Sequence, residues 1–214
     1  MKTSSNFKKS FYKIRLKKLF LFSWLTILFA GICLLFWNNE LVYSLPTPLP
    51  DNYKSVSIGT HIDLAGKLNF SDGKPYLIHF FNPDCPCSKF NMPHFKSLVN
   101  QYSDKMNFAI VVINKDKDYT SEEIQNRFGL TVPVLFDKSI AISCGVYSTP
   151  QAVILDRNQQ LYYRGNYNKS RYCTDAKSDF AQAAIDSLLN NNSNPMFSPL
   201  ALKAYGCTLP DCKK

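Results

Sequence analysis

Residues 80–88 read Phe80-Phe81-Asn82-Pro83-Asp84-Cys85-Pro86-Cys87-Ser88. Two cysteines separated by a single proline follow an apolar run, at the point where a strand is expected to end and a helix to begin. A thiolate at the N-terminus of a helix faces N–H groups that lack a partner within the helix, and it also faces the positive end of the helix dipole. Both stabilise its negative charge, so this turn is predicted to carry reactive thiol chemistry.

The segments around this turn alternate between strand and helix patterns. Apolar and alternating runs predict strands at 76–81, 108–113, 132–136, 152–156 and 160–164, the last two forming a hairpin. Apolar spacing and helix start signals predict helices at 86–102, 120–129, 139–144 and 174–189. This order indicates an α/β sandwich with a central mixed β-sheet.

The N-terminal part of the chain has the pattern of a membrane anchor. Residues 1–18 hold seven Lys or Arg and no acidic residue, and residues 19–37 carry no charge. As a helix, this uncharged stretch would be about 28 Å long, close to the thickness of the hydrocarbon core of a bilayer. The positive flank predicts a cytoplasmic N-terminus and an extracytoplasmic remainder. A cleaved signal peptide is the alternative, but only the late Val42-Tyr43-Ser44 resembles a cleavage site.

The charge follows the same division. The formal net charge is +9, and the cytoplasmic tail supplies seven of the 25 basic residues, which leaves 18 basic against 16 acidic residues. The basic balance therefore indicates topology, and no nucleic-acid partner is expected. Residues 38–54 form a proline-rich linker, residues 55–190 the folded domain, and residues 191–214 a tail that contains cysteines.

Six of the seven cysteines lie in the exported part. Cys33 falls in the anchor, where packing against lipid accounts for it. The other six are Cys85, Cys87, Cys144, Cys173, Cys207 and Cys212. An even number in an oxidising compartment favours disulfide bonds, but spacing does not give their connectivity. Cys144 is expected to be a packing or structural residue. Cys207 and Cys212 are candidates for a small structural disulfide loop, with a mobile dithiol that reloads the active site as the alternative.

The order of elements and the cysteine turn together resemble the thioredoxin-like superfamily. Its members carry two aromatic residues at the end of a strand and then a Cys-x-x-Cys motif that opens a helix, and here Cys85 matches the nucleophile. Ser88 stands at the resolving position and Cys87 lies one residue early, which departs from the pattern. The further matches are Pro93 within the helix, His79 in place of a buried acid, and Thr149-Pro150 in place of the cis-proline loop.

The resemblance implies a membrane-anchored, exported thiol–disulfide oxidoreductase. Cys85 would attack a disulfide, and Cys87 or Cys173 would resolve the mixed disulfide. His79 is a candidate for proton transfer, although a histidine within a strand is also an ordinary core residue. A cis Pro150 would let the backbone of Thr149 pair with an extended peptide. Two residues apart in a helical turn, the side chains of Cys85 and Cys87 diverge, so a bond between them needs a distorted turn.

Three alternatives remain open. A peroxiredoxin-like peroxidase would want Thr or Ser at the position of Asn82. Cys85 and Cys87 could bind Cu(I) in a protein of cofactor assembly, and a non-enzymatic module could use the groove for peptide binding. No cofactor or metal is assigned, because no His–Cys spacing resembles a zinc site. The expected partners are protein thiols or disulfides and the inner (cytoplasmic) membrane, with the signal-anchor helix crossing once and the domain in the periplasm. The oligomeric state is left open.

Overall fold

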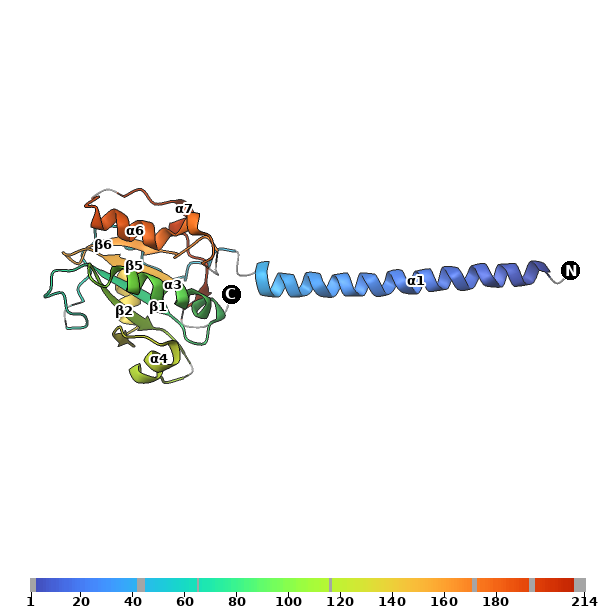
Figure 1. Ribbon diagram of the computed structural model, residues 1–214, viewed down its shortest axis with the longest axis horizontal. Helices are drawn as coiled ribbons and strands as arrows, with labels where there is room; N and C mark the ends of the chain where they lie inside the picture. The colour runs from blue at the N-terminus through green and yellow to red at the C-terminus, as the bar shows by residue number, and fades with distance from the viewer. Residues whose placement is uncertain are drawn as a thin grey trace. The chain divides into compact units, whose positions relative to one another are not determined.

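The computed structural model describes residues 3–41, 45–64, 66–115, 117–170, 173–192 and 195–209. The chain separates into two units, one up to Val42 and one from Tyr43 onward. The first unit is the helix α1 (Thr3–Phe36), which continues as a short π-helix η1 (Trp37–Leu41) (Figure 1). Its stretch Arg15–Leu41 is long and apolar enough to cross a membrane, a property that signal sequences share. The structure is thus compatible with a single-pass anchor.

The second unit is built on a five-stranded mixed sheet in the order β3-β2-β1-β5-β6. Its strands are β1 (Tyr76–Phe81), β2 (Asn107–Val112), β3 (Val134–Leu135), β5 (Gln151–Leu155) and β6 (Leu161–Gly165). The pairs β1–β2 and β2–β3 are parallel, whereas β1–β5 and β5–β6 are antiparallel. The predicted α/β sandwich with a central mixed sheet is therefore confirmed.

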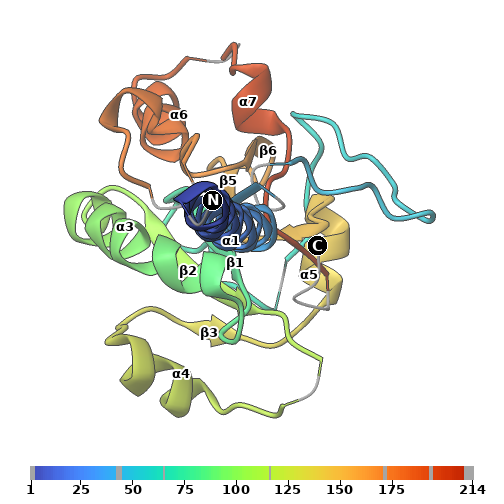
Figure 2. The same ribbon diagram turned by 90° about the vertical axis from the view of Figure 1, so that its right-hand side faces the viewer.

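Helices cover both faces of this sheet (Figures 1 and 2). They are α3 (Pro86–Tyr102), α4 (Ser121–Phe128), α5 (Ser139–Cys144), α6 (Phe180–Leu189) and α7 (Pro199–Leu202). Alternate residues of β1 enter two cores because successive strand side chains point to opposite faces. Leu77 and Phe81 join α3, α4 and α6, whereas Ile78 and Phe80 join α5.

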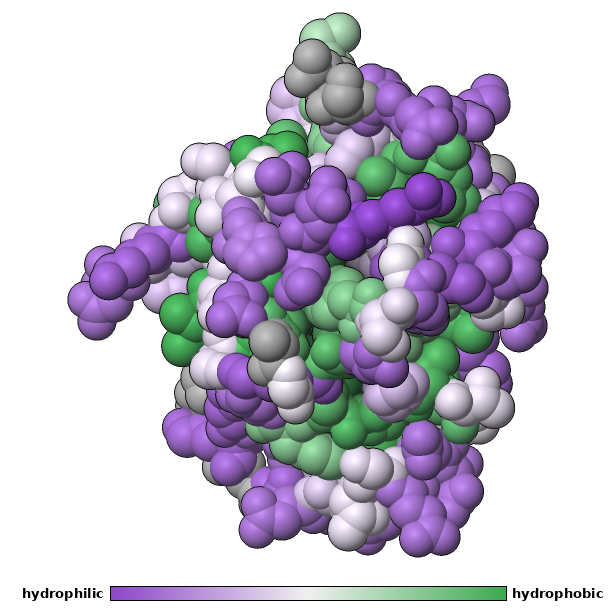
Figure 3. Space-filling model, turned by 90° about the vertical axis from the view of Figure 1, so that its left-hand side faces the viewer, coloured by the Kyte–Doolittle hydropathy of each residue, from purple (hydrophilic) through white to green (hydrophobic). Residues whose placement is uncertain are grey.

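Hydrophobic side chains are largely withdrawn from the surface of this domain. On the face drawn in Figure 3, hydrophilic residues make up much of the outline, and hydrophobic residues form patches between them. Most of the large apolar side chains that are exposed belong to residues 16–37 of the first unit. This distribution is compatible with a membrane-crossing helix in the first unit.

The last predicted helix begins later than its pattern indicated. Instead of starting at residue 174, α6 starts at Phe180, after the short 3₁₀ helix η2 (Ala176–Ser178). The reason is local, because the Asp179 side chain accepts a hydrogen bond from the backbone N–H of Gln182 and caps the helix there. Asp175 caps η2 in the same way through the N–H of Lys177.

The residues assigned to the tail pack on the domain over their described part. Helix α7 lies against β6, where Ala201 is buried (Figure 2). The strand β7 (Cys207–Thr208) then pairs antiparallel with β4 (Ser148–Thr149) to form a second, two-stranded sheet. Strands of two residues leave no periodic pattern, so neither β4 nor β7 was expected from the sequence.

Candidate active site

Cys85 stands just outside helix α3. It is the N-cap residue with an extended backbone (φ −80°, ψ 126°), Pro86 follows inside the first turn, and Cys87 is already helical. Proline suits this position because its fixed φ is pre-organised for a helix and its missing N–H would have no helical partner. Since Cys85 is not helical, the divergence of side chains expected within a helical turn does not apply to this pair.

Asn82 organises the loop before the cysteines. The Asn82 Oδ1 accepts a hydrogen bond from the backbone N–H of Asp84 at 2.9 Å, and its backbone carbonyl accepts one from the N–H of Cys85 at 3.1 Å. The neighbouring Asp84 carboxylate accepts a hydrogen bond from the Tyr119 hydroxyl at 2.7 Å, and Arg127 lies 3.9 Å from the same oxygen. These partners fix the turn and offset the negative charge beside Cys85.

The third sulfur of the site comes from the tail. The Sγ atoms of Cys85, Cys87 and Cys207 lie within 4.8 Å of one another, and all three residues are buried. They form a small buried cluster that is separate from the two larger cores. At this separation, a modest shift of side chains brings any two sulfurs to bonding distance. The same three thiols could instead hold a soft metal ion, which is the Cu(I) alternative left open by the sequence, with Cys207 as a third sulfur.

The tail reaches Cys207 through a close contact with the proline loop. Thr149 pairs with Cys207 in the β4–β7 ladder, and the peptide bond from Thr149 to Pro150 is cis. A Cβ on Gly206 would lie only 2.3 Å from the Thr149 carbonyl oxygen, so glycine is required there. The Thr47 hydroxyl donates to the Gly206 carbonyl and accepts from the Gly206 N–H, both at 3.0 Å. The segment expected to be a linker thus ties the tail in place.

His79 lies on β1 inside the core beneath α3. Its ring stacks on Phe95 with centroids 4.7 Å apart, and Nδ1 lies 2.8 Å from the Tyr167 hydroxyl. Burial lowers the pKa of His79 to about 3, so the ring is neutral at physiological pH. Its Nε2 atom has no hydrogen-bond partner among the described residues. A role for His79 in proton transfer stays a prediction.

Cys173 and Cys144 lie outside the sulfur cluster of Cys85, Cys87 and Cys207. Cys173 packs against the core under α3, where its sulfur accepts a hydrogen bond from the Asn91 amide at 3.0 Å, and burial raises its pKa to about 11. Cys144 ends α5, and burial raises its pKa to about 12. Among the described residues, neither sulfur joins the cluster of Cys85, Cys87 and Cys207. The structure therefore places Cys207, not the predicted Cys173, beside the motif.

The expected disulfide loop between Cys207 and Cys212 falls partly outside the described residues, because Cys212 is not among them. Sequence reasoning offered Cys207 only as part of a small structural loop or of a mobile dithiol, and it did not place this sulfur beside Cys87, since Cys207 lies 120 positions further along the chain and no pattern links the two segments. One local signal was available. Gly206 directly precedes Cys207, and glycine permits the close backbone approach that the contact with Thr149 uses.

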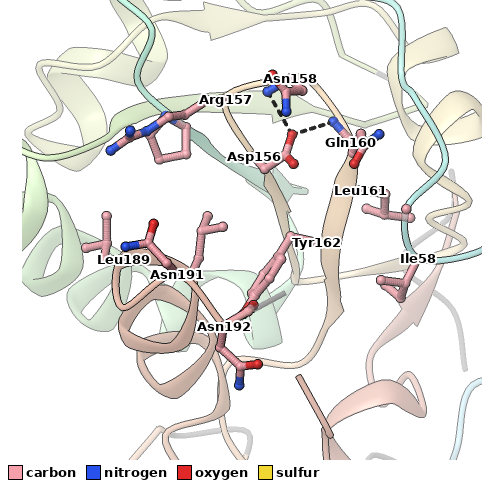
Figure 4. A pocket seen from close by; sticks show the side chains of 13 residues that line it. Ile58, Asp156, Arg157, Asn158, Gln160, Leu161, Tyr162, Leu189, Asn191 and Asn192 are labelled. Carbon is pink, nitrogen blue, oxygen red and sulfur yellow. Dashed lines mark hydrogen bonds between the residues drawn. The ribbon is translucent and has the colours of Figure 1, made fainter. Parts of the chain in front are cut away.

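A hollow on the described surface lies away from the sulfur cluster (Figure 4). It has a volume of about 300 Å³, and its wall includes Pro75, the turn Asp156–Gln160 and the end of α6. Asp156 holds this turn by accepting hydrogen bonds from the backbone N–H groups of Asn158 and Gln160, both at 2.8 Å. Pro75 precedes β1 whereas Cys85 follows it, so the hollow and the sulfur cluster lie at opposite ends of the strand.

Comparison with known proteins places this arrangement among thioredoxin-like proteins. The model of a family described as "Domain of unknown function (DUF6436)" matches residues 59–210. The chain is 24% identical over 104 residues to "Thiol-disulfide oxidoreductase ResA" of Halalkalibacterium halodurans, which covers 46% of this chain and 59% of that protein. It is 32% identical over 94 residues to "Thioredoxin-like protein YneN" of Bacillus subtilis, covering 42% and 54%. The chain thus spans less than two thirds of these relatives.

Two solved structures share the fold. A hypothetical protein from Sinorhizobium meliloti superposes with a TM-score of 0.57 at 22% identity, covering 74% of this chain and 96% of that one. An uncharacterised protein from Geobacillus kaustophilus superposes with a TM-score of 0.55 at 21% identity, covering 70% and 91%. With the mixed sheet, the cis-proline loop and the named relatives, the predicted thioredoxin-like superfamily assignment is confirmed.

Proposed function

The chain belongs to the DUF6436 family, described as a domain of unknown function, and we propose from its site that it is a thiol–disulfide oxidoreductase acting through Cys85. The observation that carries the proposal is the position of Cys85 at the N-cap of α3, with two further sulfurs within 4.8 Å. The relatives with thioredoxin-like and oxidoreductase names support a redox function of this kind.

The proposed reaction needs no cofactor. The Cys85 thiolate attacks one sulfur of a substrate disulfide, forming a mixed disulfide and releasing the other substrate sulfur as a thiolate. A second thiolate of this protein then attacks the Cys85 sulfur and releases the remaining substrate thiolate. The substrate disulfide gains two electrons and becomes two thiols, while two thiols of the protein become one disulfide. The helix N-terminus favours the first step because it stabilises the attacking thiolate.

A single-turnover assay tests this proposal. The full chain is reduced in detergent with dithiothreitol, freed of the reductant and mixed with a peptide that carries one internal disulfide. One peptide disulfide should be reduced per protein molecule, and Cys85→Ser should abolish the reaction. Cys33→Ser is the matched control, because Cys33 lies in the anchor helix, and it should retain full turnover. Turnover that survives in Cys85→Ser overturns the proposal.

The second candidate function is soft-metal binding, which the three clustered sulfurs favour. Thiolates select Cu(I), and a buried three-sulfur site suits its trigonal coordination, whereas structural zinc usually takes four ligands. Titration of the reduced protein with Cu(I) against a chromogenic chelator measures this directly. A three-thiolate site predicts one tightly bound ion that Cys207→Ser weakens strongly and Cys173→Ser leaves unchanged. Equal binding in both variants would rule out this site. No observation favours the peroxidase. The position at which it would want Thr or Ser holds Asn82, whose side-chain oxygen accepts a hydrogen bond from the backbone N–H of Asp84.

The proposed location follows from the first unit. The helix Arg15–Leu41 is compatible with a single membrane crossing, and the basic residues before it favour a cytoplasmic N-terminus by the positive-inside rule. The domain and its partners, proteins with exposed disulfides or thiols, would then lie on the extracytoplasmic side. Labelling of intact cells with a membrane-impermeant amine reagent should modify exposed lysines of the domain, such as Lys54 and Lys105, and labelling of these lysines only after lysis would contradict this orientation.

A further inference from the structure

We infer that strand β7 occupies the place of a substrate strand and that its Cys207 is the thiol that resolves the mixed disulfide on Cys85. This inference rests on the proposed function and adds to it a resolving residue, Cys207, and a segment that controls access to the site, strand β7. Two observations carry it. Cys207 is paired with Thr149, the residue before the cis-proline, and its sulfur lies within 4.8 Å of the sulfurs of Cys85 and Cys87.

The first observation concerns the edge of β4. An extended peptide binds to such an edge by adding a strand, with its backbone bonded to the backbone of the edge. In this protein the edge is already taken, because Ser148 pairs with Thr208 and Thr149 pairs with Cys207. The tail therefore presents its cysteine to Cys85 from the position in which a bound peptide would present its own.

The second observation concerns access. Cys85 and Cys207 are fully buried and Cys87 is 2% exposed, so a peptide disulfide cannot reach the cluster while β7 is in place. Strand β7 is held by this two-residue ladder and by the hydrogen bonds between Thr47 and Gly206, and each of these bonds adds only a modest net stability, so the strand can leave without unfolding the domain. Opening of β7 would uncover the β4 edge and the Cys85 sulfur in one movement.

The same movement in reverse supplies the resolving step. After Cys85 has attacked, its sulfur is bonded to a substrate sulfur. When β7 returns to β4, the Cys207 thiol gives its proton to solvent, and its thiolate attacks the Cys85 sulfur. The Cys85–substrate bond breaks, a Cys85–Cys207 disulfide forms, and the substrate leaves as a thiolate. A dithiol reductant then returns the Cys85–Cys207 disulfide to two thiols.

Cys207 is better suited to this step than Cys87. Cys87 lies in the first turn of α3, so the helix holds its backbone and only its side chain can move toward Cys85. Cys207 comes from a separate strand that can adjust its position. Cys173 is a weaker candidate because its sulfur lies outside the cluster and is engaged by the Asn91 amide.

The resolving role is tested by trapping. Reduced full-length protein in detergent is mixed with the disulfide peptide and quenched with acid, and the products are mapped by mass spectrometry. Cys207→Ser should accumulate a Cys85–peptide adduct that persists at least about tenfold longer than in the wild type, because serine cannot attack a disulfide. Cys173→Ser should resemble the wild type, whose oxidised form should hold a Cys85–Cys207 link. A wild type whose first-formed link, quenched at the earliest times, joins Cys85 to Cys87 or to Cys173 overturns the inference while leaving the proposed function intact. Failure of the wild type to reduce the peptide overturns both.

The gating role is tested by Gly206→Ala. The added methyl group would meet the Thr149 carbonyl oxygen at 2.3 Å, so β7 is pushed from β4. Alkylation of Cys85 by iodoacetamide should then accelerate at least about tenfold, because overpacking of this size shifts the closed state strongly toward the open one. Leu202→Ala is the matched control, since this tail side chain is 43% exposed and should leave the rate unchanged. Equal alkylation of Cys85 in Gly206→Ala and the wild type would overturn the gating role.

Discussion

The backbone N–H of Asn82 donates a hydrogen bond to the Oγ of Ser88 at a distance of 3.2 Å. Both residues are buried, with Ser88 fully so. Ser88 holds the place of the second cysteine in a Cys-x-x-Cys motif, and in this protein its side chain ties the first turn of α3 back to the loop before Cys85. The position has therefore become structural, while Cys87 and Cys207 bring the additional sulfurs.

Ser88→Ala should weaken the fold without ending the chemistry. The substitution leaves the buried N–H of Asn82 without its acceptor, which costs about 1–3 kcal/mol of stability. Thermal unfolding should show a lower Tm, while reduction of the disulfide peptide at 25 °C continues. Ser103→Ala, at an exposed position after the end of α3, should leave the Tm unchanged. A variant with an unchanged Tm and no turnover would show that Ser88 acts in the reaction instead.

His79 should make stability depend on pH in the acid range. Its pKa is about 3 in the folded protein because of burial, against 6.5 as the ordinary value, so the unfolded chain binds the proton more tightly. Stability is fully present above pH 6.5 and falls as the pH drops toward 3, by up to about 1.4 kcal/mol per pH unit. His79→Phe should remove this part of the slope when the Tm values of both proteins are compared between pH 4 and 7. An equal slope in the two proteins would contradict the assignment.

Cys144 and Cys173 should resist alkylation in the folded protein. Burial raises their pKa values to about 12 and about 11, so at pH 8 only about one thiol in 10³ to 10⁴ is ionised. Mass-spectrometric mapping after treatment with iodoacetamide should find both unmodified, and both should react in guanidinium chloride. Rapid labelling of Cys173 in the native protein would restore it as a candidate for the redox reaction.

Asn166→Ala should loosen the tail. The Asn166 amide donates hydrogen bonds to the carbonyl oxygens of Leu200 at 2.8 Å and Lys203 at 2.6 Å, and its Oδ1 accepts one from the N–H of Tyr205. Loss of these bonds should cost about 2–3 kcal/mol and increase hydrogen exchange in the tail. Asn158→Ala, on the exposed turn of the β5–β6 hairpin, is the control and should leave exchange in the tail unchanged. Unchanged exchange in the Asn166 variant would mean that other contacts hold the tail.

The elements around the cysteine turn could be predicted from sequence because local signals agree there. The apolar run 76–81 is β1, and the helix expected at 86–102 is α3 with the same bounds. Thr120 and Glu123 form the capping box that opens α4. In each case the hydrophobic pattern and the start signal lie within a few residues of each other, so the local sequence is sufficient to predict the element.

The complete site could not be predicted in this way. Cys207 reaches Cys85 only because Thr47, Gly206 and Thr149 meet in space, and these residues are far apart in the chain. The expected divergence of Cys85 and Cys87 failed for a different reason, because it assumed that both were helical whereas Cys85 is the extended N-cap. The extended backbone of Cys85 at the helix boundary therefore determines where its sulfur points, and the spacing of the two cysteines does not reveal this backbone conformation.

The sulfur cluster of Cys85, Cys87 and Cys207 has an odd number of members. Any one disulfide among them leaves a bystander thiol within reach of the bond, so the oxidised cluster has three isomers of equal electron count. These isomers can interchange by internal attack, without a reductant. Under the proposed chemistry, the protein would then hold the same disulfide either within the start of α3, between Cys85 and Cys87, or between α3 and strand β7. The dominant isomer would determine whether β7 stays bonded to α3 or is free to leave β4 and expose the site to the next partner.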